Sequence, residues 1–420
     1  MTGAGSAVLN RLSSLSSRCL YAVRLGCLLA LVAPGPAHAQ TAAESSAAEA
    51  RLTVGPFAFS PRFSLRDVGV DSNVFNEESD PQRDFTMTAG PGLDTWLRIG
   101  RLWVTSSSTV EWVHFSEAAT QRAFNVGQDV RLDLDLLRVV PHVAGGYARS
   151  RRRLNLEIDG RLEETVTYAE GGVEIKPGPR TVIDLRGRRQ RTRYGDEVFG
   201  GVSLASRLDR QSDSASLDVR YELTPLTTFV VQTGVQQDRF DFDPVRDSDA
   251  LRVAPGLEFK PFALISGKAM VGFEQFETRD ATVPDYRGVV AEVDVAYTVR
   301  DAFRFTVRAT RDVEYSIELL EPFYVSTGAE IEIVRVIGLS WDVVGRAGRT
   351  ALAYQAIENG VLAGRADRID RVDQYGVGLG RHLGEDLRVG VDVTYAKRRS
   401  DLPGRSYSGW RTGGSLTYGF

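Results

Sequence analysis

Cysteine and long apolar runs are scarce in this chain, and each scarcity excludes a class of protein. Only two cysteines occur, Cys19 and Cys27, and both lie within the first 39 residues. Beyond that point the chain can form neither a disulfide nor a thiolate metal site. No run of 18 or more apolar residues occurs anywhere in the sequence, which excludes helices that span a membrane.

An excess of positive charge is also missing. The chain has 51 Lys and Arg residues against 55 Asp and Glu residues, for a formal net charge of −4. The first 39 residues contain three arginines and no acidic residue, so losing them takes the net charge from −4 to −7. A nucleic-acid-binding protein is expected to carry a basic surface. We therefore expect no nucleic-acid partner.

The first 39 residues are typical of a secretory signal peptide. Arg11, Arg18 and Arg24 precede a short apolar run over residues 25–33, which is about the length of a signal core. Pro34 then breaks the run, and the segment ending at Ala39 matches the small-x-small cleavage pattern. We predict cleavage after Ala39, followed by a short flexible periplasmic lead-in over residues 40–55. Lipid attachment at Cys27 is disfavoured by the neighbouring Arg24.

From residue 56 to residue 420, polarity alternates along stretches of about 10–16 residues. The clearest examples are residues 214–223, 289–299, 303–312 and 388–395. Strict alternation places one set of side chains on each face of a sheet. Apolar residues on one face and charged residues on the other are the signature of transmembrane β-strands.

The links between these stretches alternate in length. Tight links include residues 99–101, 224–226 and 300–302, whereas residues 195–211 and 357–366 form longer polar links. Short periplasmic turns and longer external loops are typical of bacterial barrels. We predict an all-β, antiparallel up-and-down transmembrane barrel of about 18 strands. Sixteen strands remain possible, because residues 57–70 and the region near Leu154 alternate irregularly.

A soluble two-sheet sandwich is the competing fold. It would need two buried cores, and strands with one fully polar face do not supply them. The last strand also favours the membrane barrel, because Trp410, Leu416, Tyr418 and Phe420 share one face. Tyr418 and the terminal Phe420 resemble the signal by which the barrel-assembly machinery recognises its substrates.

Aromatic residues near strand ends suggest girdles at the two membrane surfaces. The residues expected there are Trp96, Trp103, Trp112, Tyr147, Tyr194, Tyr221, Tyr297, Tyr354, Tyr375, Tyr395 and Tyr418.

Several short segments resemble a known family. They are residues 64–75 with the D-x-N-V-F sequence at Asp71, residues 283–288, residues 323–325 and residues 341–347. In these segments the chain is similar to the bacterial outer-membrane β-barrel porin family, the second family of that name. The resemblance implies a barrel fold and a location in the outer membrane of a Gram-negative-type bacterium. It carries no catalytic residues.

The alternation places many charged side chains in the lumen. The candidate lumen charges are Asp184, Arg186, Arg188, Asp218, Arg220, Glu292, Asp294, Arg304, Arg308 and Asp312. Opposite charges on neighbouring strands stabilise a barrel wall, and charged rings also select solutes in a water-filled pore. The two interpretations are compatible.

Two arginine-rich segments, residues 151–153 and 186–193, allow two interpretations. They form either an anion-attracting ladder at a pore mouth or a basic surface that meets lipopolysaccharide phosphates. We favour the second interpretation.

The leading functional hypothesis is a porin-like channel for passive diffusion of small polar solutes, with outer-membrane lipid, lipopolysaccharide and the assembly machinery as partners. A second hypothesis is a non-conducting barrel that anchors or assists export of surface polysaccharide. A third is a surface hydrolase at the rim, built on His114. We expect no enzyme, cofactor or metal, and the sequence leaves the oligomeric state open.

Overall fold

The structure is a computed structural model. It describes residues 47–48, 50–153, 155–157, 161–195, 198–199, 201–260, 264–300, 302–338, 340–357, 368–384 and 386–419. The predicted signal peptide with its cleavage site at Ala39 lies outside the described residues, as do Leu154 and Phe420.

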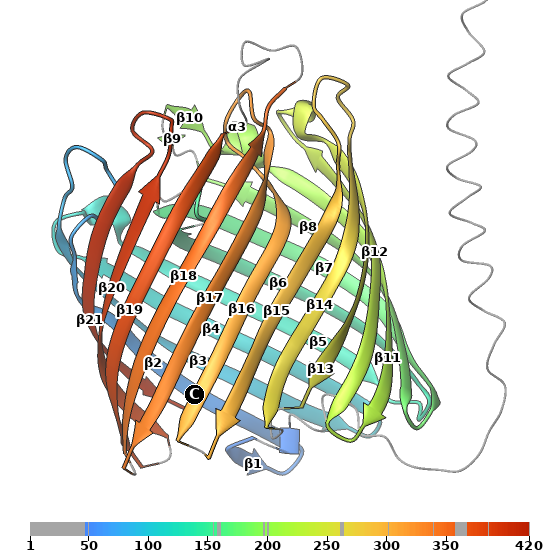
Figure 1. Cartoon of the computed structure of the whole chain (residues 1–420). Helices are drawn as coiled ribbons and strands as arrows, with labels where there is room; N and C mark the ends of the chain where they lie inside the picture. The colour runs from blue at the N-terminus through green and yellow to red at the C-terminus, as the bar shows by residue number, and fades with distance from the viewer. Residues whose placement is uncertain are drawn as a thin grey trace, which may run out of the picture.

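Eighteen long strands form the body of the molecule (Figure 1). The first nine are β2 (Phe57–Asp71), β3 (Asp84–Ile99), β4 (Leu102–Phe115), β5 (Ala123–Leu134), β6 (Val139–Arg153), β7 (Arg161–Gly178), β8 (Thr181–Tyr194), β11 (Arg210–Thr224) and β12 (Thr227–Phe240). The other nine are β13 (Ser248–Phe259), β14 (Ile265–Thr278), β15 (Tyr286–Val299), β16 (Phe303–Tyr315), β17 (Phe323–Ile337), β18 (Trp341–Gln355), β19 (Ile369–Leu383), β20 (Leu387–Arg399) and β21 (Tyr407–Tyr418).

Short elements complete the fold. They are β1 (Leu52–Val54), β9 (Val198–Phe199), β10 (Val202–Ser203), the helix α3 (Ala205–Leu208) and the 3-10 turns η1 (Ala119–Gln121) and η2 (Pro244–Arg246). Among the residues with described positions, no helix is long and apolar enough to cross a membrane.

Each long strand pairs antiparallel with the next, and β2 pairs with β21 to close the ring. Closure gives each of the 18 long strands a partner on both sides, which is what a sheet in lipid requires. The expected barrel is confirmed with 18 strands rather than 16. Figure 1 shows the strands inclined to the barrel axis, with β1 and the end of β21 at the same end of the barrel.

The predicted alternation divides each strand into two faces. On β15, Val289, Val293 and Val295 alternate with Glu292 and Asp294, and β14 and β16 continue the same faces in register. The apolar side chains are exposed on the outer surface, as Val289 at 52% and Phe273 at 52% illustrate. In the outer membrane this surface contacts lipid.

Tight turns connect the strands at the end where β1 lies. Several of these turns contain a residue with left-handed backbone, among them Gly100 (φ 63°), Arg300 (φ 50°) and Gly384 (φ 78°). Longer links lie at the opposite end. By the usual asymmetry of bacterial barrels, the short turns are periplasmic and the long loops are extracellular.

The irregular alternation of residues 57–70 has a local cause. β2 carries a bulge between Leu65 and Val68, where Asp67 adopts φ 56° and the register shifts against β21. Next to the bulge, Gly69 lies against β21 so closely that an added Cβ would be 1.9 Å from the carbonyl oxygen of Thr412. The seam that closes the barrel therefore needs glycine at this position.

Replacing this glycine is expected to weaken the closing seam. Gly69→Val should lower the free energy of unfolding by about 1–3 kcal/mol, because the side chain forces β2 and β21 apart. The matched control is Gly345→Val in β18, where an added Cβ meets no atom within 4 Å. Urea titration of the heat-modifiable gel shift measures both variants. Equal stability of the two variants would contradict this account of the seam.

Candidate functional site

Ion pairs between strands that are not neighbours identify the concave face of the wall. Arg252 on β13 pairs with Asp312 on β16, over two intervening strands. Arg388 on β20 donates to Asp342 on β18 at 2.6 and 2.8 Å, over β19. Side chains reach over intervening strands in this way on the inside of a barrel. The charged face is therefore the lumen face.

The ten candidate lumen charges all share this face by strand register. Arg186 contacts Asp218 at 2.5 Å and Asp184 at 3.8 Å, and Arg220 contacts Asp218 at 3.4 Å. This group shields two aspartates that lie directly opposite one another on β8 and β11. Cross-strand pairing of opposite charges stabilises the wall here.

A second group lines β14 to β17. Arg308 lies 3.6 Å from Asp294 and 2.6 Å from Glu330, and Lys268 lies 2.6 Å from Glu292. The side chains of Glu292 and Asp294 are 56% and 55% exposed even though they point inward. Inward-facing groups with such exposure border a space open to water.

The remaining candidates occupy nearby positions on the same face. Arg188 lies 3.9 Å from Glu170 and stacks on the ring of Tyr168 at 3.8 Å. Arg304 lies between Thr298 and Val334 in the register.

The wall near Tyr168 contains a recess of about 340 Å³. Trp96 and Tyr168 contribute rings, and Asp129, Arg131 and Arg188 contribute charge. Tyr168 donates a hydrogen bond to Asp129 at 2.6 Å. A recess with aromatic faces and both signs of charge can hold a small polar solute against the wall.

Four aromatic residues expected in the membrane girdles lie on the lumen face instead, namely Trp96, Trp103, Tyr194 and Tyr354. Trp103 is 7% exposed and Tyr354 is fully buried. The expectation was wrong for these residues because closeness to a strand end does not determine the face, which depends on register.

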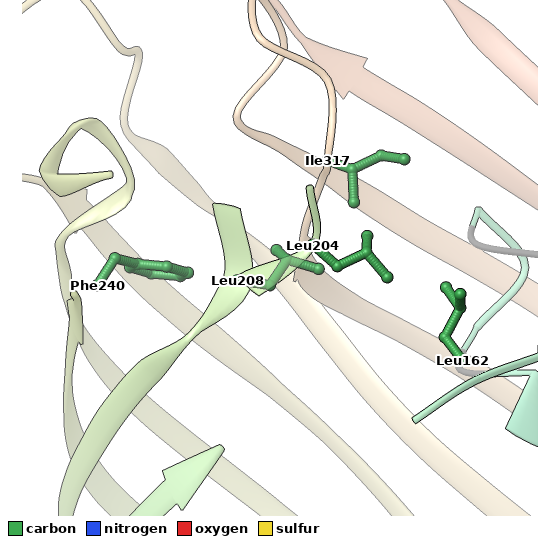
Figure 2. Close-up of a cluster of buried hydrophobic side chains, with 5 residues drawn as sticks. All are labelled: Leu162, Leu204, Leu208, Phe240 and Ile317. Atoms are coloured by element: carbon green, nitrogen blue, oxygen red, sulfur yellow. The ribbon is translucent and has the colours of Figure 1, made fainter. Parts of the chain in front are cut away.

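The extracellular end of the lumen contains an apolar cluster, shown in Figure 2. Leu204 caps the start of α3, and Leu208 is its last residue. Both pack with Leu162 of β7, Phe240 of β12 and Ile317 of the β16–β17 loop. Leu204 and Ile317 are fully buried. The segment 195–211 thus contributes a helix that lies inside the mouth.

A polar network crosses the mouth beside this cluster. Glu157, in the β6–β7 loop, accepts a hydrogen bond from the Ser316 hydroxyl at 2.6 Å and from the Ile317 amide at 3.1 Å. Arg398 on β20 donates to the carbonyls of Leu156 (3.0 Å) and Glu157 (2.8 Å) and pairs with Asp370 at 2.7 Å. The β6–β7 and β16–β17 loops start on nearly opposite sides of the ring. We call this network the mouth bridge.

Glu157 is the most perturbed acid of the mouth bridge. Burial raises the pKa of its carboxyl from an ordinary value of 4.5 to about 7, with a further increase from Glu318. The hydrogen bonds from Ser316 and Ile317 and the charge of Arg398 lower it only in part. No local sequence signal distinguishes Glu157, because its partners lie 159 and 160 residues away.

His114, the candidate for a rim hydrolase, lies on the outward face of β4. It pairs in register with Met87, and its ring lies 5.2 Å from that of Trp112. Among the described residues, no group of three or more His, Cys, Asp or Glu side chains is placed to hold a metal ion. The surroundings of His114 are those of a girdle residue.

A closed 18-strand antiparallel barrel with an apolar outer surface and a charged lumen defines a porin-like protein of the outer membrane of Gram-negative-type bacteria. The chain belongs to the family described as "Putative beta-barrel porin 2", whose model matches residues 49–418. The resemblance seen in the sequence is confirmed.

Solved barrels are similar to this chain at low identity. The outer-membrane protein OpdK of Pseudomonas aeruginosa is 10% identical over 86% of this chain and 98% of that chain, with a TM-score of 0.49. OccK3 (OpdO) of the same species is 12% identical over 86% and 95%, with a TM-score of 0.49. The siderophore receptor PirA of Pseudomonas aeruginosa is 9% identical over 86% of this chain and 80% of that chain, with a TM-score of 0.41. Among curated proteins, none matches this chain.

The mouth bridge is expected to weaken with rising pH. Because the pKa of Glu157 is raised in the closed bridge, its contribution is fully present below the ordinary pKa of a glutamic acid and is lost as the pH rises through about 7. Hydrogen-exchange protection of residues 316–318, corrected for the intrinsic exchange rate at each pH, should fall between pH 4.5 and about pH 7 and stay constant above it.

Glu157→Gln should remove this pH dependence, because the amide stays neutral and keeps an oxygen that accepts from Ser316. Glu117→Gln, in the β4–β5 loop, is the matched control and should behave like the parent chain. A pH dependence that persists unchanged in Glu157→Gln would show that another group is responsible.

Proposed function

We propose that this protein is a channel for passive diffusion of small polar solutes across the outer membrane. The observation that carries the proposal is the hydrated lumen face of β14 to β17, where inward-pointing Glu292 and Asp294 are more than half exposed. Barrels of 16–18 strands leave an aqueous channel unless another segment fills it. The recess beside Trp96 supplies a place where a solute contacts the wall.

The lumen charges on one side of the barrel favour cations. The lumen face of β13 to β17 carries four cationic side chains and eight carboxylates. The cations are Arg252, Lys268, Arg304 and Arg308, and the carboxylates are Glu258, Glu274, Glu292, Asp294, Asp312, Glu314, Glu330 and Glu332. Excess carboxylate in a pore attracts cations and repels anions.

We also propose a role for the end of the chain in assembly. Tyr418 faces outward on β21, where it pairs with Phe63 and Leu387. With Phe420, it would form the aromatic signal for the barrel-assembly machinery.

A second candidate is the non-conducting barrel that anchors or assists export of surface polysaccharide. The observation that favours it is the packing of Leu162, Leu204 and Ile317 across the mouth, which narrows the path through the barrel. Conductance separates the two candidates, because the second requires that folded barrels pass no ions.

Single-channel recording in planar bilayers tests the channel. The parent chain should conduct and prefer K⁺ over Cl⁻, and the double variant Glu292→Gln/Asp294→Asn should shift the permeability ratio toward one. Glu277→Gln is the matched control, because Glu277 lies on the outward face of β14 and should leave selectivity unchanged. Folded, heat-modifiable barrels without conductance at any pH would overturn the channel and favour the second candidate.

A further inference from the structure

Four cationic side chains surround one carboxylate on the outward face of β18 to β20, near their extracellular ends. Arg349 lies opposite Asp373 on the neighbouring strand, Asp373 lies opposite Lys397, and Arg371 lies opposite Arg399. We call Arg349, Arg371, Lys397, Arg399 and Asp373 the outer patch. Its net charge is +3.

The carboxylate of Asp373 in the outer patch already pairs with two arginines. Arg349 donates to one oxygen of Asp373 at 2.5 Å, and Arg399 lies 3.2 Å from the other oxygen. The side chain of Asp373 is 4% exposed, whereas those of Arg349 and Arg399 remain 61% and 57% exposed. Asp373 therefore fixes two guanidinium groups in place while most of their surface stays open to the exterior.

Arg371 and Arg399 form a directly opposed pair of like charges. Such a pair destabilises a sheet unless an anion lies near it. With Asp373 already shared by two arginines, the outer patch has an excess of cationic donors on a single surface. An anion bound there would offset the repulsion.

Several other outward-facing arginines near the same rim also bond carboxylates. Arg149 lies 2.9 Å from Glu163, Arg189 lies 2.6 Å from Asp213, and Arg239 pairs with Asp249 at 2.5 Å. Asp249 also lies 3.2 Å from Arg279, so this carboxylate is shared by two arginines. Each of these groups carries at most one unbalanced positive charge, whereas the outer patch carries three.

The position of the outer patch along the membrane normal follows from the residues below it on the same face. Tyr375 lies opposite Tyr395, whose ring lies 4.6 Å from that of Trp410. Val377, one outward position beyond Tyr375, and Val391, two outward positions beyond Tyr395, are 63% and 60% exposed toward lipid. Aromatic residues mark the membrane surface. The cations directly above them lie at the depth of the lipid headgroups.

We propose that the outer patch binds the phosphate groups of an anionic lipid of the outer leaflet. Guanidinium groups bind phosphate through paired, charge-assisted hydrogen bonds. The acyl chains of such a lipid would lie along Val377 and Val391, and its headgroup would contact Tyr375 and Tyr395. Lipopolysaccharide, which carries phosphates on its lipid moiety, has this chemistry. The inference is independent of conduction.

The test compares lipid binding by two sets of variants in detergent micelles, with native mass spectrometry as the measurement and phosphorylated lipid A as the probe. The double variant Arg371→Gln/Arg399→Gln should weaken binding about ten-fold, equivalent to ~1.4 kcal/mol. The control Arg335→Gln/Arg381→Gln removes two outward cations at the opposite, periplasmic ends of β17 and β19 and should bind as the parent does. The heat-modifiable gel shift verifies that both variants are folded.

Two further arms identify the ligand. Lipid A without phosphates should bind at least ten-fold more weakly to the parent chain, and inorganic phosphate at the concentration of the lipid should not displace it. Equal binding by the parent and the Arg371→Gln/Arg399→Gln variant would overturn the proposal. Displacement by equimolar inorganic phosphate would overturn it too, because the site would then recognise a free anion.

Discussion

The structure depends on one requirement, which is that every backbone amide and carbonyl within the membrane finds its hydrogen-bond partner in the chain itself. Pairing of β2 with β21 meets this requirement by joining the first long strand to the last. The bulge at Asp67 and the close approach at Gly69 accommodate that contact. Because the ring is closed, each strand has one face toward lipid and one toward the lumen, and these two environments govern the chemistry of the whole protein.

The two faces use charge differently. In the lumen, carboxylates and guanidinium groups pair across strands and still contact water, as the group around Arg308 illustrates. On the outer surface of β18 to β20, the charges near the extracellular strand ends lie above a belt that includes Tyr375 and Tyr395. An arginine therefore has a different physical role on each face. Arg186 stabilises the wall beside Asp218, whereas Arg371 lies where lipid headgroups are expected.

The sequence predicts features of this barrel that repeat along the chain. Period-two polarity in residues 289–299 and 303–312 predicted β15 and β16, and the same parity placed Asp184 and Arg308 on the lumen face. Because short and long links alternate along the chain, consecutive strands were predicted to lie side by side and antiparallel, which gives the strand order. Regular local patterns contain this information because each strand face meets a uniform environment.

Features that depend on register or on distant partners could not be predicted in this way. Trp96 and Tyr354 point into the lumen because of one-residue differences in parity near strand ends. The bulge at Asp67 interrupts the alternation and made β2 hard to recognise. Glu157 meets Ser316 across 159 residues of chain, and this contact exists only after the ring has closed.

The mouth bridge also affects the mechanics of the wall. A cylinder one strand thick resists stretching around its circumference through its hydrogen bonds, but it flattens easily into an oval. The contacts from Glu157 to Ser316 and from Arg398 to the β6–β7 loop join distant parts of the rim and so limit that flattening. The periplasmic end has short turns instead, so the described network makes the two ends of the cylinder unequal in stiffness. Release of the mouth bridge would thus change the cross-section of the whole lumen as well as the width of its entrance.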